Sequence, residues 1–224
     1  MRVVCFDLDD TLYKEIDYLK SAYREIANYA AEYCHGCSAP VLVLAHKAYE
    51  VMLAAYREGG NAFEALNRFS GLNLPASDYL YIYRNHKPKI ALSEDVVRML
   101  DTLKVKGVRM GLITDGRSVQ QRNKIEALGL SRWIDDEDMV ISEEFGSEKP
   151  ALANYTYFME RYPECQDFTY VGDNPRKDFI APNTLGWLTV CLKDDGRNIH
   201  RQDFLSLAEE AVPKWLIGNL MEIR

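Results

Sequence analysis

The sequence predicts an α/β fold in which a doubly wound parallel sheet carries an inserted α-helical subdomain. Short apolar runs alternate with helical patterns along most of the chain, which is the order typical of parallel strands joined by helices. One long segment near the N-terminus interrupts this alternation and offers helical patterns alone. With 224 residues, the chain is long enough for one large domain or for a main domain with a small companion.

The predicted strands are short runs that each end in a polar or glycine-containing turn. Because their apolar character is continuous, we expect them to be covered on both faces. They are residues 3–6, 108–113, 139–142, 168–171 and 187–191. A last edge strand is expected at residues 213–218, followed by a short helix capped by Asn219.

Helical patterns with start and stop signals lie between these strands. Residues 95–106 follow the N-cap candidate Ser93, residues 119–128 end at Gly129, and residues 151–162 end before a proline.

The inserted segment contains four helical patterns, at residues 17–33, 41–58, 61–69 and 79–83. We therefore expect a core formed by residues 1–13 and 87–224, and a helical subdomain formed by residues 14–86.

Composition limits the classes of partner and compartment. The 34 acidic residues outnumber the 27 Lys and Arg residues, and this net charge of -7 argues against binding to a nucleic acid polymer. Asp7 interrupts the first apolar run after five residues, and no stretch reaches the roughly 20 apolar residues of a membrane span. We expect a cytoplasmic protein that does not enter a membrane.

The five cysteines are scattered and odd in number, so no disulfide framework is expected. Cys34 and Cys37 form the one C-x-x-C spacing. A redox or metal role for this pair stays open beside the alternative of thiols that merely flank a helix end.

Polar side chains gather at the carboxyl ends of the predicted strands, where open α/β sheets bind their ligands. The first strand runs into DLDDTL with Asp7, Asp9 and Asp10, and the second ends in LITDG. Further along, SEKP places Lys149 directly before a helix, and GDNPRKD follows the strand at residues 168–171. Three carboxylates within four positions repel one another and are costly to bury, so the grouping calls for a positive partner.

These four motifs resemble those of the haloacid dehalogenase (HAD) superfamily. Its phosphatases carry D-x-D-x-T/V, a strand-end Thr or Ser, a distant Lys and G-D-x(3,4)-D in the same order. Because the motifs run from residue 7 to residue 178, the resemblance extends along the chain. It implies a Rossmann-like core, with the inserted helices as a cap of the superfamily's first class.

The resemblance also implies roles for the aspartates. Asp7 would be the nucleophile that forms an aspartyl phosphate, and Asp9 the general acid and base. A magnesium ion would be held by the carboxylates of Asp7 and Asp173 and the backbone carbonyl of Asp9. Asp178 would support this metal site by contacting the ligand residues without binding the ion itself.

The other motifs imply a phosphate site. Thr114, the amides of Asp115 and Gly116, and the ammonium of Lys149 would hold the phosphoryl oxygens. Asp10 has no chemical role in this scheme, and we expect its side chain to accept hydrogen bonds from turn amides.

The expected function is magnesium-dependent hydrolysis of a small-molecule phosphomonoester, without a prediction of oligomeric state. Residues 79–129 resemble members that act on nucleoside monophosphates, and sugar phosphates remain open as substrates.

Three alternatives use related residues. A 2-haloacid dehalogenase attacks carbon and lacks the second aspartate, so Asp9 and Asp173 favour phosphoryl transfer. A phosphosugar mutase carries the same set, and the core motifs do not separate it from a phosphatase. A phosphate-binding receiver domain is disfavoured, because it is shorter and orders its motifs differently.

Overall fold

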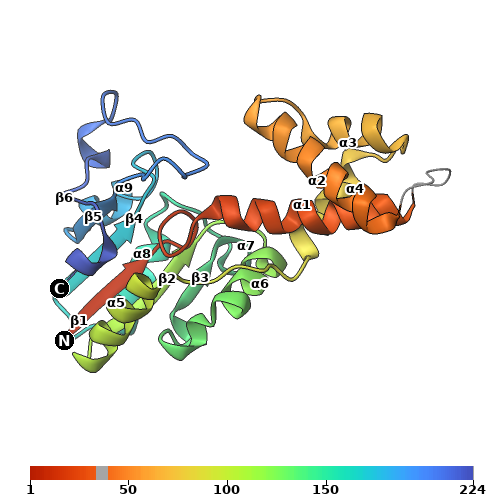
Figure 1. Ribbon diagram of the computed structural model, residues 1–224. Helices are drawn as coiled ribbons and strands as arrows, with labels where there is room; N and C mark the ends of the chain where they lie inside the picture. The colour runs from red at the N-terminus through yellow and green to blue at the C-terminus, as the bar shows by residue number, and fades with distance from the viewer. Residues whose placement is uncertain (34–39, 224) are drawn as a thin grey trace. The chain divides into compact units, whose positions relative to one another are not determined.

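The computed structural model describes residues 1–33 and 40–223, which form an α/β fold (Figure 1). Two compact units are present, Met1–Ile16 with Ala91–Arg224, and Asp17–Ile90. Cys34 and Cys37 lie outside the described residues. None of the described helices has the length and apolar character that a membrane span requires.

A six-stranded parallel sheet forms the centre of the larger unit. Its strands are β1 (Arg2–Phe6), β2 (Arg109–Thr114), β3 (Met139–Ile141), β4 (Asp167–Gly172), β5 (Leu188–Leu192) and β6 (Trp215–Ile217). Their order is β3-β2-β1-β4-β5-β6, with every pair parallel. The order reverses beside β1, which places the switch point of the sheet between β1 and β4. The predicted fold class is confirmed.

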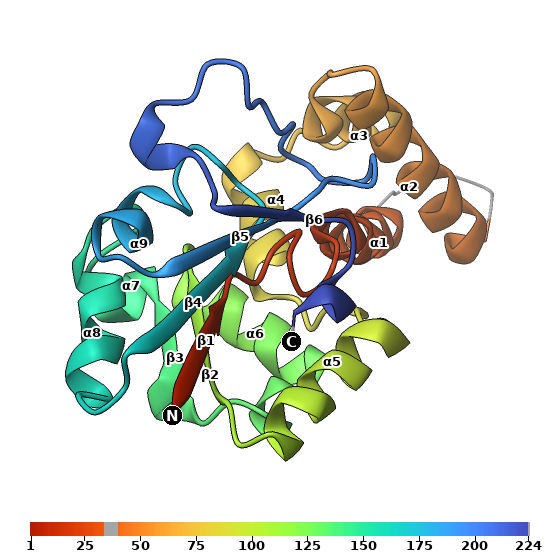
Figure 2. The ribbon, with the colours of Figure 1, turned by 90° about the vertical axis from the view of Figure 1, so that its left-hand side faces the viewer.

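Helices cover both faces of this sheet, with α5 and α6 on one face and α8 and α9 on the other (Figure 2). Their bounds are α5 (Glu94–Val105), α6 (Ser118–Leu128), α8 (Ala153–Arg161) and α9 (Ile180–Thr184), with the short α7 (Ser142–Phe145) after β3. Four short 3-10 turns complete the unit, at Leu130–Arg132, Asp136–Asp138, Glu209–Ala211 and Leu220–Glu222.

Local signals in the sequence fix several of these ends. The Ser93 side chain accepts a hydrogen bond from the amide of Val96 and caps α5, and Gly129 ends α6 in the left-handed conformation (φ 63°). Asn219 caps the turn after β6, as expected. The strand expected at residues 139–142 ends one residue earlier, because Ser142 begins α7. The five-residue α9 has no strong helical pattern and was not anticipated.

The smaller unit is helical. It contains α2 (Val41–Arg57), α3 (Ala62–Ser70), α4 (Ala76–Asn85) and nearly all of α1 (Glu15–Glu32). Tyr79 is fully buried, and its hydroxyl donates to Asn67 Oδ1 (2.6 Å). The Tyr18 hydroxyl donates to the backbone carbonyl of Tyr83 (2.6 Å), which ties α1 to α4. Aromatic side chains therefore supply both apolar area and specific hydrogen bonds in this unit.

One face of the sheet packs closely against α8. Gly111 on β2 lies under the ring of Phe158, and a Cβ at this position would lie 2.4 Å from that ring and 2.9 Å from Cys5 Sγ. Both neighbours are fully buried, so neither has space to move.

We expect Gly111→Ala to lower the free energy of unfolding by about 1–3 kcal/mol, because the added methyl group overpacks this contact. Urea unfolding followed by far-UV circular dichroism measures the change. Gly218→Ala is the matched control, since its Cβ would meet only Glu222 Oε1 at 3.7 Å. Equal stability of the two variants would contradict the packing argument.

Candidate active site

Asp7 and Lys149 form a buried ion pair at the carboxyl edge of the sheet. Asp7 follows β1 directly, and its amide donates to the carbonyl of Val171 on β4 (2.8 Å), so the sheet fixes its position. Lys149 Nζ donates to Asp7 Oδ1 (2.5 Å) and to Asp178 Oδ1 (2.8 Å), and its side chain is 1% exposed. Tyr170 on β4 accepts a further hydrogen bond from this ammonium (3.1 Å).

Three buried carboxylates converge beside this lysine. Oxygens of Asp7, Asp173 and Asp178 lie within 4.8 Å of one another. Burial raises the pKa of Asp7 to about 7, helped by the Asp178 charge and opposed by Lys149. Burial and the charge of Asp7 raise the pKa of Asp173 to about 9. The single positive charge of Lys149 does not neutralise three carboxylates. Their oxygens are the type of ligand that a hard divalent cation such as Mg²⁺ prefers.

Asp178 organises the loop that follows β4. Its Oδ2 accepts the backbone amides of Asp173 (3.1 Å) and Asn174 (2.8 Å), while its Oδ1 faces Lys149. Gly172 makes this approach possible, since a Cβ there would lie 2.4 Å from Asp178 Oδ2. Asp178 therefore positions the loop and the lysine together.

A second loop, after β5, also holds Asp173. Asn198 Nδ2 donates to Asp173 Oδ2 (2.8 Å), and Gln202 Nε2 donates to the Asp173 carbonyl (2.7 Å). Lys14 Nζ donates to Asn198 Oδ1 (2.7 Å) and so orients the Asn198 amide. Sequence reasoning missed Asn198 and Gln202, because they lie outside the four motifs and in a segment without a clear pattern.

The residues expected to bind phosphate follow β2. Thr114 is buried, and its hydroxyl accepts a hydrogen bond from Gln121 Nε2 (2.6 Å). The Gly116 amide donates to Ser142 Oγ (2.9 Å), so a phosphoryl oxygen would have to share or replace this bond. The Asp115 carboxylate accepts the amide of Lys149 (3.0 Å) and joins the two loops.

Asp9 points to a different set of partners from Asp7. Lys124 Nζ donates to both of its carboxylate oxygens (2.7 and 2.8 Å), Tyr13 donates to Oδ1 (2.5 Å) and Gln121 to Oδ2 (3.0 Å). Burial alone would raise the pKa of Asp9, but these donors, Lys124 foremost, outweigh it and lower the pKa. The sequence analysis did not identify Lys124 and Gln121 as site residues, because they look like ordinary polar residues of a helix. Their i, i+3 spacing, which places them on one helix face, was the one signal that could have pointed to them.

The Asp10 side chain accepts hydrogen bonds from backbone amides, as expected. Its two oxygens accept the amides of Glu15 (2.9 Å) and Ile199 (2.9 Å), and its own backbone has φ 59°. It thus fastens the turn after β1 to the loop after β5. Glu15 lies near Asp9 and Lys124, and burial together with the Asp9 charge raises the pKa of Glu15 to about 8.

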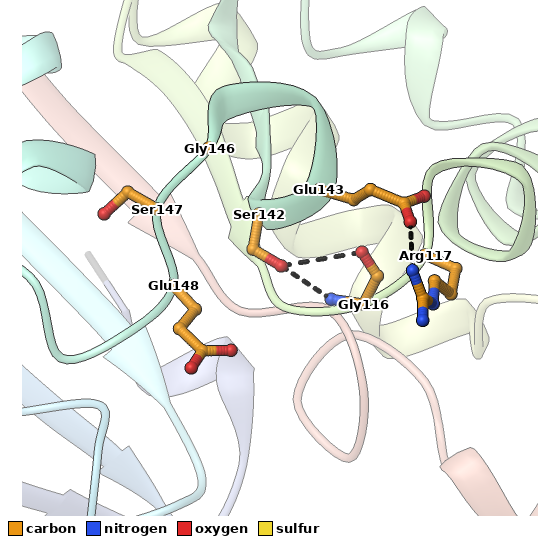
Figure 3. Close-up of a pocket in the computed structure, with 7 residues that line it drawn as sticks. All are labelled: Gly116, Arg117, Ser142, Glu143, Gly146, Ser147 and Glu148. Carbon is orange, nitrogen blue, oxygen red and sulfur yellow. Dashed lines mark hydrogen bonds and ion pairs between the residues drawn. The ribbon is translucent and has the colours of Figure 1, made fainter.

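A hollow of about 500 Å³ borders the loop after β2 (Figure 3). It is lined by Gly116, Arg117, Ser142, Glu143, Gly146, Ser147 and Glu148. In Figure 3 the Ser142 side chain points at the backbone of Gly116, and Arg117 pairs with Glu143 (2.6 Å). The lining, as described, consists of polar side chains and glycine, next to the loops that carry Asp115 and Lys149.

Comparisons with known proteins agree with this geometry. The family model of haloacid dehalogenase-like hydrolases matches residues 1–186. A curated protein of Methanocaldococcus jannaschii named glyceraldehyde 3-phosphate phosphatase is 26% identical over 98% of this chain and 94% of its own length. Pyrimidine 5'-nucleotidase YjjG of Escherichia coli is 30% identical over 51% of this chain and 48% of its own length.

Solved structures share the fold. The crystal structure of a HAD phosphatase from Thermococcus onnurineus superposes with a TM-score of 0.59 and 19% identity, covering 100% of this chain and 96% of the other. The family model extends over more than half of the chain and includes all four motifs. The chain therefore belongs to the haloacid dehalogenase-like hydrolases, and within them it is a phosphoric monoester hydrolase.

Proposed function

We propose that the protein is a magnesium-dependent phosphatase that hydrolyses a small sugar-type phosphomonoester through an aspartyl phosphate on Asp7. The observation that carries the proposal is the buried Asp7–Lys149 pair among the carboxylates of Asp173 and Asp178. A nucleophilic carboxylate needs positive charge beside it to approach a phosphate dianion, and this arrangement gathers both.

In the first step an Asp7 oxygen attacks phosphorus, and the bond from phosphorus to the leaving oxygen breaks. The electron pair stays on that oxygen, which takes a proton from Asp9. In the second step water attacks the phosphoryl group, Asp9 takes a proton from the water, and the Asp7 carboxylate is released. Asp9 serves in both steps because its carboxylate bonds to Lys124, Tyr13 and Gln121 and not to Lys149.

The metal ligands in this proposal are the carboxylates of Asp7 and Asp173 and the backbone carbonyl of Asp9. The bound ion supplies the positive charge that Lys149 alone does not provide. Asp178 holds the amide of Asp173 and the ammonium of Lys149 at once, which supports its role behind the ligands.

Phosphate binding is assigned to Thr114, the amides of Asp115 and Gly116, and Lys149. In this arrangement the Gly116 amide donates to a phosphoryl oxygen in place of Ser142 Oγ. The helical unit, residues 17–90, is assigned the role of the cap that excludes water during the reaction.

The hollow beside the loop after β2 supports a sugar-type substrate. Its lining offers a guanidinium, carboxylates and hydroxyls, which suit the hydroxyl groups of a short carbon chain. A nucleobase usually stacks on an aromatic ring, and none of the residues that line this hollow is aromatic. The relative named glyceraldehyde 3-phosphate phosphatase aligns over nearly the whole of both chains, whereas the nucleotidase aligns over about half. Both observations favour a sugar-type phosphate.

Asp7→Asn is expected to lower the rate of phosphate release at least about 10³-fold, because an amide is a poor nucleophile in the same space. Phosphate release with and without EDTA measures this, and thermal unfolding checks that the fold is intact. Asp167→Asn, at the opposite end of the sheet and exposed, is the matched control. A variant at Asp7 that keeps full metal-dependent activity would assign the nucleophile elsewhere.

Magnesium is expected to raise the melting temperature of the wild-type protein. At 100 times Kd, binding adds about 2.7 kcal/mol, which is roughly 5–10 °C for a chain of this size. Asp173→Asn should show a smaller rise, because it loses a charged ligand. Without metal at pH 8, that variant should be no less stable than wild type. With its pKa raised to about 9, the folded Asp173 carboxyl has to take up a proton that the unfolded chain does not bind at this pH, and the amide avoids this cost. Differential scanning calorimetry in matched NaCl provides the measurement, and an equal magnesium shift in both proteins would refute the ligand assignment.

A substrate panel tests the class of compound. We expect kcat/KM for triose and other sugar phosphates to exceed that for nucleoside monophosphates by at least about 10-fold, since the lining of the hollow matches hydroxyl groups. A nucleotide that ranks first would overturn the substrate class while leaving the phosphatase chemistry in place.

A further inference from the structure

We propose that Lys124 is a positioning residue for the reaction: together with Gln121 it holds the Asp9 carboxyl where it exchanges a proton with the leaving group. This inference rests on the proposed phosphatase function. It adds a residue from α6 that none of the four motifs contains.

The contacts of Lys124 are directed at Asp9. Its side chain is 1% exposed, and its ammonium lies 2.7 and 2.8 Å from the two carboxylate oxygens. The next carboxylate oxygen, on Glu15, is 4.0 Å away. With the Tyr13 hydroxyl on Oδ1 and the Gln121 amide on Oδ2, both oxygens of Asp9 receive two donors each. The carboxylate is therefore fixed in direction as well as in place.

Gln121 connects this carboxylate to the expected phosphate site. Its Nε2 lies 3.0 Å from Asp9 Oδ2, 2.6 Å from Thr114 Oγ1 and 3.1 Å from the carbonyl of Asp115. Gly116 lies against the same amide, since a Cβ there would be 3.2 Å from Gln121 Cδ. The spacing between the Asp9 carboxyl and the loop that holds the phosphoryl oxygens is thus set by one buried side chain.

Stability alone gives little reason for such a pair. A buried ion pair is often no more stable than apolar side chains of similar volume, because both charges lose their hydration. An apolar residue at position 124 would also continue the buried side of α6, which includes Ile125 and Leu128. A lysine at this position is therefore better explained by what it does to Asp9.

The consequence for catalysis depends on the leaving group. An alkoxide is a strong base and leaves slowly unless a well-placed acid protonates it. A p-nitrophenolate is a stable anion and leaves without a proton. Displacing the Asp9 carboxyl should therefore slow the cleavage of an alkyl phosphate much more than that of p-nitrophenyl phosphate.

The test compares Lys124→Met and Lys124→Gln with wild type on these two substrates. Rapid quench with enzyme in excess measures leaving-group release in the first turnover, so that the hydrolysis of the phosphoenzyme does not enter. For the Met variant we expect the rate on the best alkyl phosphate to fall about 10²-fold, and the rate on p-nitrophenyl phosphate to fall less than about 10-fold. The Gln variant, which keeps a donor, should lie between the Met variant and wild type.

Arg122→Gln is the matched control, because it removes a cation from the same helix. Arg122 pairs with Glu144 and Asp136 instead of Asp9, so both rates should stay near wild type.

The readout is the ratio of the two rates, which partial unfolding cannot change, because loss of folded protein lowers both rates equally. A Met variant with an unchanged ratio would overturn the proposal. A wild-type protein that releases no phosphate from any compound would instead refute the phosphatase function on which the proposal rests.

Discussion

The buried ammonium of Lys149 is the interaction on which the rest of the site depends. Burial opposes its charge, but Asp178 and Asp7 outweigh burial and raise the pKa of Lys149 well above its usual value. A charge in this position is stable only while its carboxylate partners stay in place. The loops after β1, β3 and β4 are therefore joined through a single side chain.

Much of the surrounding structure can be understood as support for that lysine. Asp115 holds its backbone amide, Asp178 holds its ammonium, and the absence of a side chain at Gly172 lets Asp178 come close. Beneath it, Tyr170 joins the core through its edge-to-face contact with Tyr155 (ring centroids 5.1 Å apart). The packing of α8 on the sheet thus reaches the reactive carboxylates through one continuous set of contacts.

The sequence was sufficient for the parts of the molecule that depend on local pattern. The apolar runs predicted the sheet because strands covered on both faces need apolar residues at every position. The fold brings Asp7, Lys149, Asp173 and Asp178 together because parallel strands end at one edge.

Residues that act through long-range contacts were not accessible in this way. Lys124 is 115 residues from Asp9, and Asn198 is 25 residues from Asp173, so no local spacing links either pair. Lys and Asn are residue types that usually lie at the surface, but here Lys124 is buried and Asn198 is partly buried. A buried polar residue is recognised only once its partner is known, which is why the structure adds them and the motifs do not.

The two aspartates that follow β1 show how one strand end can place two carboxylates in different environments. Asp7 and Asp9 are two residues apart, yet each faces its own lysine, one on the loop before α8 and one on α6. Burial raises the pKa of Asp7 to about 7, and Lys149, which Asp7 shares with Asp178, only partly opposes this rise. Lys124, Tyr13 and Gln121 all donate to Asp9, and these hydrogen bonds, Lys124 foremost, lower its pKa against the effect of burial.

This difference separates their roles in physical terms. In the proposed reaction, a cation bound beside Asp7 would favour its ionised, nucleophilic form. The donors around Asp9 hold its carboxylate in one direction, and in the proposed reaction this group moves protons rather than binding phosphorus. In the proposed reaction, the division of labour between Asp7 and Asp9 therefore depends on which lysine each carboxylate contacts, because the two side chains are chemically the same.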